Sequence, residues 1–496
     1  RCLEKNPKER FQTSPELLAE LHSQLRAWQA KAEGVVTPGG NEARPSVAVL
    51  PFADMSAAKD QDFFCEGMAE EIMNALAHVD GIRVASRTST FKASRNSGDL
   101  ATIASALSVD HILEGSVRTL GSRLRVTARF TDVAKDTPLW SEKYDRETID
   151  LFAIQDEIAG SVVDAIKARL KTGGPGVPQR AQVRNVEAYR HFLQGRFQRH
   201  TKNNVVLAMQ AYEDATRLDP EHGMAWVGLA ETCALSVHYG LLKASEGCAR
   251  AHAALAIAER LQGATPEAQS VLGFMGFIER RWRDLEVAYR RVLEQRPNHV
   301  PSLGPFGAML GARHRLDDAR IVLDRCREAD PLAAFPCAMT GLCFVAAGEP
   351  EEGLPYLDDA LSFEPDHMTT LWVSGVAYIA LGRVPEALAR FERGLELTRR
   401  SAFFLGLVGW ALATLGRESD ARTFLAELQS RDINAPRVGS DVFLLAALGE
   451  IELAFEALER AMAEFQPFVY YTAFPGFNPM RSDPRFAAHL AALGLA

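Results

Sequence analysis

The sequence predicts a multidomain chain in which an α/β domain is followed by an all-α superhelical solenoid, with a short helical segment at the N-terminal end. Two observations predict this fold class. From Ser46 short β-rich runs alternate with helical patterns, and from about Val186 the apolar pattern is helical and repeats every 34 residues. A chain of 496 residues is too long for one hydrophobic core, whereas repeat arrays grow linearly with length.

Stretches rich in glycine and proline set the predicted boundaries. Residues 37–40 (Thr-Pro-Gly-Gly) and 173–176 (Gly-Gly-Pro-Gly) contain no bulky apolar side chain and are typical of linkers. The predicted division is a helical segment at 1–33, a linker at 34–44, the α/β domain at 45–170, a second linker at 171–185, an array of about eight repeats at 186–466, and an aromatic C-terminal segment at 467–496.

The α/β domain is predicted from its order of elements. Alternation of apolar and polar residues is clearest in 124–131, where Leu124, Val126, Ala128 and Phe130 share one face. Strands are expected at 46–52, 82–86, 111–118, 124–131 and 139–145, with helices at 64–79, 100–107 and 150–170 and a hairpin turn at 121–122. This βαβα order followed by a β meander and a helix is typical of a small α/β domain.

Five segments of this domain together resemble the TolB-like N-terminal domain of bacterial signalling proteins. They are Val47-Ala-Val-Leu-Pro-Phe52, Phe64-Cys-Glu-Gly-Met-Ala-Glu-Glu71, Arg87-Thr-Ser89, Leu113-Glu-Gly-Ser-Val-Arg118 and Leu139-Trp-Ser-Glu-Lys-Tyr-Asp-Arg146. The resemblance implies a position between an effector and a repeat array. It implies no catalytic activity.

Small residues and prolines recur at one spacing in the second half of the chain. The registers 34 residues apart are Gly273, Gly307, Gly341, Gly375 and Gly409; Ala319, Gly353, Ala387 and Ala421; Pro297, Pro331 and Pro365; and the turn glycines Gly348, Gly382 and Gly416. This period fits two antiparallel helices, in which small residues allow close approach and proline ends the second helix.

The order Leu371, Gly375, Tyr378, Ala387, Phe391 resembles tetratricopeptide repeats. The resemblance implies a superhelix whose concave groove is lined by the first helix of each hairpin. We count eight repeats, the second of which is about ten residues too long, so an irregular loop is expected at residues 238–246.

Seven apolar residues are predicted to line the groove and to bind a protein or peptide partner with bulky anchors: Phe274, Phe277, Phe335, Trp372, Ile379, Phe403 and Trp410. The alternative is that several of them pack between neighbouring hairpins. The C-terminal segment holds Phe465, Phe468, Tyr470, Tyr471, Phe474 and Phe477 around two prolines. It is predicted to cap the last hairpin, or alternatively to fold back into the groove.

The first residues, Arg1-Cys-Leu-Glu-Lys-Asn-Pro-Lys-Glu-Arg10-Phe11, resemble the last conserved segment of bacterial Ser/Thr protein kinases. With the start at Arg1 in place of Met, this resemblance predicts a fragment of a larger kinase. ATP and Mg²⁺ are implied only for the missing kinase lobe, because this chain holds no glycine-rich loop, H-R-D or D-F-G motif. The alternative is an ordinary basic amphipathic helix.

Composition narrows the classes of partner. A net charge of -9 and a pI near 5.8 disfavour nucleic-acid phosphates. Seven scattered cysteines without a C-x-x-C pair predict reduced, mostly buried thiols. No apolar stretch is long enough to predict a membrane span, so a cytoplasmic protein is expected. We identify no catalytic, cofactor-binding or metal-binding residue.

These observations predict a non-catalytic protein-interaction and regulatory region of a kinase. A second hypothesis is a nucleotide or small-ligand site in the α/β domain, with Phe52, Ser86 and Arg87 near its rim at the carboxyl ends of the strands. A third makes the array a spacer or a homo-oligomerisation surface.

Overall fold

The computed structural model describes residues 45–77, 79, 81–120, 123–147, 151–170, 185–202, 204–430, 439 and 441–494. These residues belong to one compact unit that begins at Pro45. The predicted helical segment at 1–33, the linker at 34–44, the turn at 121–122 and all but the last residue of the linker at 171–185 lie outside the described residues.

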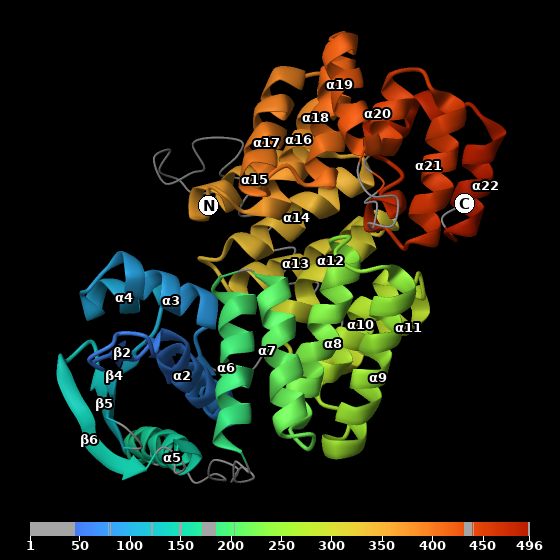
Figure 1. The fold of residues 1–496 in the computed structure, drawn as a ribbon. Coiled ribbons are helices and arrows are strands. Elements are labelled where there is room, and N and C mark those ends of the chain that lie inside the picture. The colour runs from blue at the N-terminus through green and yellow to red at the C-terminus, as the bar shows by residue number, and fades with distance from the viewer. Residues whose placement is uncertain are drawn as a thin grey trace, which may run out of the picture. The chain divides into compact units, whose positions relative to one another are not determined.

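The first part of this unit is a small mixed sheet with helices (Figure 1). Its elements are β1 (Ser46–Val49), β2 (Ala53–Asp54), α2 (Asp62–Ala77), β3 (Arg83–Val84), α3 (Arg87–Asn96), α4 (Leu100–Leu107), β4 (His111–Leu120), β5 (Arg123–Asp132), β6 (Thr137–Glu147) and α5 (Leu151–Leu170). The strand order is β3-β1-β4-β5-β6, with β2 paired to β4. β1 runs parallel to β3 and β4, while β4, β5 and β6 form the predicted antiparallel meander.

The predicted alternation in β5 is confirmed, because Leu124, Val126, Ala128 and Phe130 are all buried. The sequence prediction missed helix α3. Its polar composition, with two serines and two threonines in ten residues, gives it a low helix propensity. The helix begins at a serine cap, where the Ser86 hydroxyl accepts a hydrogen bond from the Ser89 amide at 3.3 Å.

The second part consists of sixteen helices that pair into eight antiparallel hairpins. They are α6 (Val186–His200), α7 (Val205–Leu218), α8 (Gly223–His238), α9 (Ala244–Gln262), α10 (Pro266–Ile278), α11 (Trp282–Gln295), α12 (Val300–Ala312), α13 (Leu316–Ala329), α14 (Ala334–Ala347), α15 (Pro350–Phe363), α16 (Met368–Ala380), α17 (Val384–Leu397), α18 (Ala402–Thr414), α19 (Glu418–Ser430), α20 (Asp441–Ala447) and α21 (Ile451–Ala463). The predicted array of helical hairpins is therefore present.

The glycines of the first helices allow the close approach that the period predicts. A Cβ atom on Gly375 would lie 2.2 Å from the ring of Phe391 on the partner helix α17, and one on Gly307 would lie 2.4 Å from Leu323 on α13. These hairpins therefore close by placing a large side chain over a glycine, which fixes the register of the two helices.

The turn inside the hairpins has a left-handed residue at the predicted register. Gly348, Gly382 and Gly416 have φ values of 89°, 72° and 76°. Arg280 and His314 stand at the same register and are also left-handed, with φ values of 61° and 56°. A side chain with a Cβ atom is strained in this conformation, so these two turns are less stable locally than the glycine turns.

The second repeat differs from the prediction. Its extra residues lengthen helices α8 and α9, which have 16 and 19 residues, so the connection between them is only five residues long. After α21 the chain continues through the 3₁₀ turns η3 (Pro467–Tyr470) and η4 (Pro475–Met480) to helix α22 (Pro484–Ala492). Six cysteines of the described residues are buried and unpaired, as predicted.

Candidate protein-binding surfaces of the array

The seven predicted groove residues all lie on the first helices of hairpins. The surface that these first helices form together is here called the inner face. Phe274 and Phe277 lie on α10, Phe335 on α14, Trp372 and Ile379 on α16, and Phe403 and Trp410 on α18. Phe277, Ile379 and Trp410 are buried, and the other four are partly exposed. Their role in binding a partner stays a prediction.

Most of the seven pack between neighbouring hairpins, as the alternative interpretation expected. The ring of Phe335 covers Gly304 of α12, where a Cβ atom would come within 2.7 Å of it, and Trp410 lies 5.0 Å from the ring of Phe443 on α20. Trp372 lies 5.9 Å from Phe403 of the next hairpin, and Phe274 and Phe277 lie 5.4 and 6.3 Å from His238 of the preceding one. These residues help to join successive hairpins.

Two residues of the set also contact the chain's own C-terminal segment, residues 464–494, here called the tail. The Phe277 ring lies 5.4 Å from that of Tyr470, and the Trp372 ring lies 6.3 Å from Tyr471 and 6.1 Å from Phe474. The tail also packs on the last hairpin, where Phe443 contacts Phe468 and Phe477 at ring distances of 5.3 and 5.0 Å. Both predicted arrangements of the tail therefore occur together.

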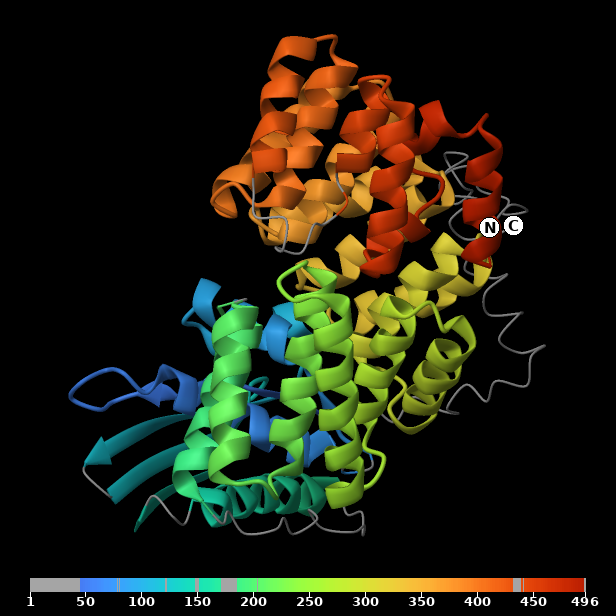
Figure 2. The same cartoon turned by 45° about the vertical axis from the view of Figure 1, so that its right-hand side comes forward.

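Hydrogen bonds fix the tail to the third hairpin. The Tyr470 hydroxyl donates to the carbonyl of Ile278 at 2.7 Å, and Trp282 Nε1 donates to the carbonyl of Leu493 at 2.9 Å. Figure 2 shows the red C-terminal helices beside the yellow-green helices that these bonds join to them. The tail thus bridges hairpins three to eight across the inner face.

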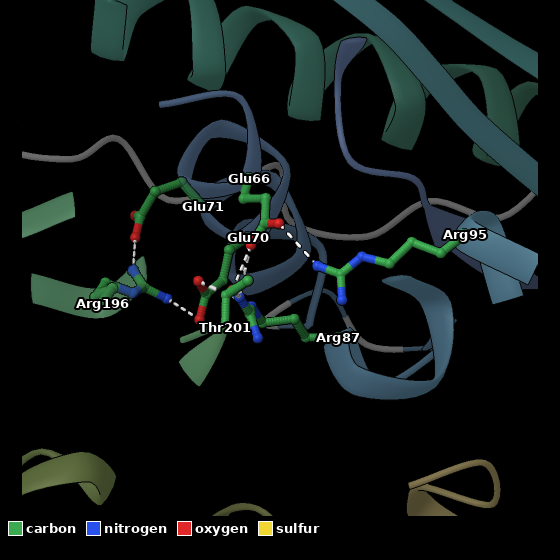
Figure 3. Close-up of polar contacts among 7 residues, drawn as sticks. All are labelled: Glu66, Glu70, Glu71, Arg87, Arg95, Arg196 and Thr201. Carbon is green, nitrogen blue, oxygen red and sulfur yellow. Dashed lines mark hydrogen bonds and ion pairs between the residues drawn. The ribbon is translucent and has the colours of Figure 1, made fainter. Parts of the chain in front are cut away.

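A second contact joins the α/β domain to the first hairpin through charged side chains (Figure 3). Arg196 on α6 forms ion pairs with Glu70 and Glu71 on α2. Arg87 on α3 contacts Glu66 at 3.0 Å, Glu70 at 3.3 Å and the hydroxyl of Thr201 at 2.7 Å. The same hydroxyl donates to Glu66, so the cluster is a closed network.

The charges in this network depend on one another. Burial opposes the ionised form of Glu70, but the nearby Arg196 and Arg87 outweigh it and lower the pKa of that carboxyl to about 2. Removing either arginine would leave the buried carboxylates with less positive charge beside them, which is unfavourable.

A third contact lies between helix α3 and the connection from α13 to α14. Asp330 accepts hydrogen bonds from the hydroxyls of Ser86 and Ser89 and, at 3.1 Å, from the Ser89 amide. It therefore caps the first turn of α3 from the array. Lys92 donates to the carbonyl of Leu332 at 2.9 Å. Burial raises the pKa of Asp330 despite these bonds.

The sequence prediction did not find these contact residues. Two of the five TolB-like segments, at 64–71 and 87–89, contain Glu66, Glu70, Glu71, Arg87 and Ser89. The resemblance therefore pointed to the segments that make the contacts, although not to their partners. The pairing with α6 and with residue 330 joins positions over 120 residues apart, and a local pattern cannot predict it.

The three residues expected at the rim of a ligand site contact other parts of the chain. Phe52 is 3% exposed and packs over Gly115, where a Cβ atom would lie 2.4 Å from its ring. Ser86 bonds to Asp330, and Arg87 belongs to the charged network. Among the described residues, no group of three or more His, Cys, Asp or Glu side chains is placed to hold a metal ion.

Comparisons with known proteins match parts of this chain. The model of the second domain of HilA/YgeH-like transcriptional regulators matches residues 43–161, which include most of the α/β domain. A protein of Rhizobium meliloti (strain 1021) named putative adenylate cyclase 3 is 33% identical over 221 residues. That stretch is 44% of this chain and 35% of the relative, so the chain spans about a third of the relative's length.

Solved structures of several helical proteins are similar to part of the chain. A monomeric mutant of IFIT1 with Gppp-AAAA covers 66% of this chain and 77% of its own at 13% identity and a TM-score of 0.44. The type IV pilus biogenesis factor PilW covers 50% and 94% at 16% identity and a TM-score of 0.30. A tetratricopeptide repeat protein of Parabacteroides merdae ATCC 43184 covers 56% and 100% at 14% identity and a TM-score of 0.35. These scores are too low to support an inference from the matched proteins. Among the helices that the structure describes, none has the length and apolarity needed to cross a membrane.

Proposed function

We propose that this chain is a non-catalytic protein-interaction and regulatory region. In this proposal the array binds a protein or peptide partner, and the α/β domain, which we take to be TolB-like, transmits that binding to an effector. The observation that carries the proposal is the pair of polar contacts between the α/β domain and the array. Because charged groups from both parts are buried there, separating the parts costs free energy. A conformational change in one part is therefore transmitted to the other.

The proposed effector is a Ser/Thr protein kinase, and the support is the resemblance of residues 1–11 to the last segment of a kinase lobe. The relative named putative adenylate cyclase 3 supports a broader version, in which a region of this kind serves more than one type of effector. In both versions the catalytic residues belong to the effector. The α/β domain and the array supply recognition and coupling.

The test measures phosphate transfer from ATP by the kinase that carries this region. Arg196→Ala and Asp330→Ala each break one contact between the α/β domain and the array, and we expect both variants to change the transfer rate. Arg190→Ala is the control, because Arg190 is exposed on the same helix as Arg196. Equal rates in all four proteins would overturn the coupling.

The hypothesis of a nucleotide or small-ligand site has a separate test. The melting temperature of the 496-residue chain is measured with ATP, cyclic AMP and cyclic GMP. We expect no shift, since Ser86 and Arg87 bond within the chain. A saturable rise in the melting temperature would favour the ligand-binding function instead.

A further inference from the structure

The tail occupies the inner face as an aromatic ligand that belongs to the same chain. The side chains of Tyr470, Tyr471, Phe474 and Phe477 are each no more than 4% exposed, and small residues and a proline separate Tyr471, Phe474 and Phe477 from one another. Aromatic anchors of this kind dominate the energy of peptide recognition because each buries a large area at little entropic cost. The inner face is therefore built to accept an aromatic segment that contains proline.

The junction where the tail enters the inner face is strained. Phe465 has a φ of 51°, and Arg280, which lies opposite it, has a φ of 61°. The Arg280 guanidinium lies 5.1 Å from the centre of the Phe465 ring. Left-handed backbone at two bulky residues in contact stores free energy at this place.

Two buried polar atoms, one in the tail and one in the second hairpin, have no hydrogen-bond partner among the described residues. They are Oε1 of Gln466, at the start of the tail, and Nδ1 of His238, whose ring lies 5.4 Å from Phe274 and 6.3 Å from Phe277. A buried polar atom without a partner costs free energy that a ligand with a matching group regains. The docked tail is therefore held by its aromatic packing and its hydrogen bonds, and it leaves Oε1 of Gln466 unsatisfied.

From these observations we propose that the tail is an exchangeable ligand, and that the partner of the array presents a short segment of the same chemistry: bulky aromatic residues spaced around proline. This inference rests on the proposed function and names the class of its partner. A tethered tail competes at a high effective concentration, so a partner segment binds well only when the tail is released. The tail thereby sets the threshold for partner binding.

The experiment uses the full chain and a fluorescent peptide with the sequence of residues 465–480 as the probe. Tyr470→Ala loosens the tail, because it removes the ring from Phe277 and the hydrogen bond to Ile278. We expect this variant to bind the probe at least about tenfold more tightly than the unchanged chain. A probe with serine in place of both tyrosines and Phe474 is the control and should not bind.

If Tyr470→Ala fails to fold, a chain whose tail is locked in place by an engineered disulfide, here called the locked chain, still tests the proposal. A Cβ atom on Gly348 would lie 3.6 Å from that of Ala473, which is within the range of a disulfide. In the chain with Gly348→Cys and Ala473→Cys, probe binding should disappear on oxidation and return on reduction. The buried native thiols, such as Cys343, have raised pKa values and react slowly.

Three results would overturn the proposal. They are a folded Tyr470→Ala chain that ignores the probe, equal binding by the oxidised and reduced locked chain, and dimerisation of the loosened chain without probe binding, which would assign the face to a second copy. None of them affects the kinase assay with the Arg196 and Asp330 variants. Failure of this inference is therefore distinguishable from failure of the proposed function.

Discussion

The array carries two docked surfaces of opposite chemistry. The α/β domain is held to the first hairpin and to the α13–α14 connection by carboxylates, guanidinium groups and hydroxyls. The tail is held to hairpins three to eight mainly by aromatic rings and hydrogen bonds to carbonyls, with an exposed ion pair between Arg485 and Glu452 at its outer edge. A charged contact is sensitive to geometry, pH and salt, whereas an aromatic contact tolerates exchange of one segment for a similar one. The first suits coupling and the second suits recognition.

The largest expected effect tests whether the charged contact depends on its arginine. Arg196→Ala removes one guanidinium from the buried carboxylates of Glu70 and Glu71 and leaves Arg87 beside Glu70, so we expect the free energy of unfolding to fall by about 3 kcal/mol. Urea denaturation at pH 7 measures this. The exposed control Arg190→Ala should change the free energy of unfolding by less than about 0.5 kcal/mol. A loss below 1 kcal/mol for Arg196→Ala would mean that the contact is not buried in solution.

Acid should weaken the charged contact and spare the aromatic one. The pKa of Glu70 is lowered from 4.5 to about 2, so its contribution is complete above pH 4.5 and is lost as the pH falls toward 2. The shift corresponds to roughly 3 kcal/mol of unfolding free energy between pH 6 and pH 2. Denaturation curves at several pH values check this. Glu70→Gln should remove that part of the pH dependence, and an unchanged slope would contradict the assignment.

The cap that Asp330 provides for α3 is expected to have a moderate effect. Asp330→Ala removes the acceptor of the Ser86 and Ser89 hydroxyls and leaves the Ser89 amide only its 3.3 Å bond to Ser86, which should cost about 2 kcal/mol. Asp330→Asn keeps an acceptor oxygen and removes a charge that burial disfavours, so its cost should stay below about 1 kcal/mol. Thermal unfolding followed by circular dichroism separates the two variants. Equal costs would show that the charge itself is needed.

The hydrogen bond of Tyr470 gives a smaller effect on the aromatic contact. Tyr470→Phe keeps the ring and removes the bond to Ile278, which should cost about 1 kcal/mol at every pH. The comparison is with Tyr239→Phe, a change at a tyrosine that is 44% exposed. A pH-dependent cost in a urea titration would contradict the view that this contact is independent of charge.

The smallest effect distinguishes a strained turn that contacts the tail from one that does not. His314→Gly relieves left-handed strain and should raise the free energy of unfolding by about 1 kcal/mol. Arg280→Gly relieves the same strain but loses the contact with Phe465, so its gain should be smaller. The difference between the two melting temperatures measures what Arg280 contributes to holding the tail.

The hairpin array was predictable because its determinants are local and repeated. Gly375 and Phe391, or Gly307 and Leu323, are 16 residues apart within one hairpin, and the same spacing recurs along the chain. The meander from β4 to β6 was predictable for a similar reason, because buried and exposed residues alternate along its central strand β5.

The contacts between parts were not predictable from the sequence. Helix α3 was missed because its composition is polar, and its first turn is capped by Ser86 together with the distant Asp330. The pairing of Arg196 with Glu70, and of Phe277 with Tyr470, is decided by how the superhelix brings distant turns together. Sequence reasoning placed the seven predicted inner-face residues on the correct helices. It could not distinguish a residue that packs within the array, such as Phe335 against Gly304, from one that contacts the tail, such as Trp372.

Repeat arrays commonly gain or lose whole units by recombination, because each unit contacts only its neighbours. The α/β domain of this chain contacts both the first hairpin and residue 330, and three complete hairpins lie between the first hairpin and α14. One unit more or fewer in that interval would carry Asp330 away from helix α3. The two contacts of the α/β domain therefore fix the number of hairpins in the first half of the array. We expect insertions and deletions in this interval to change the lengths of loops and not the number of hairpins.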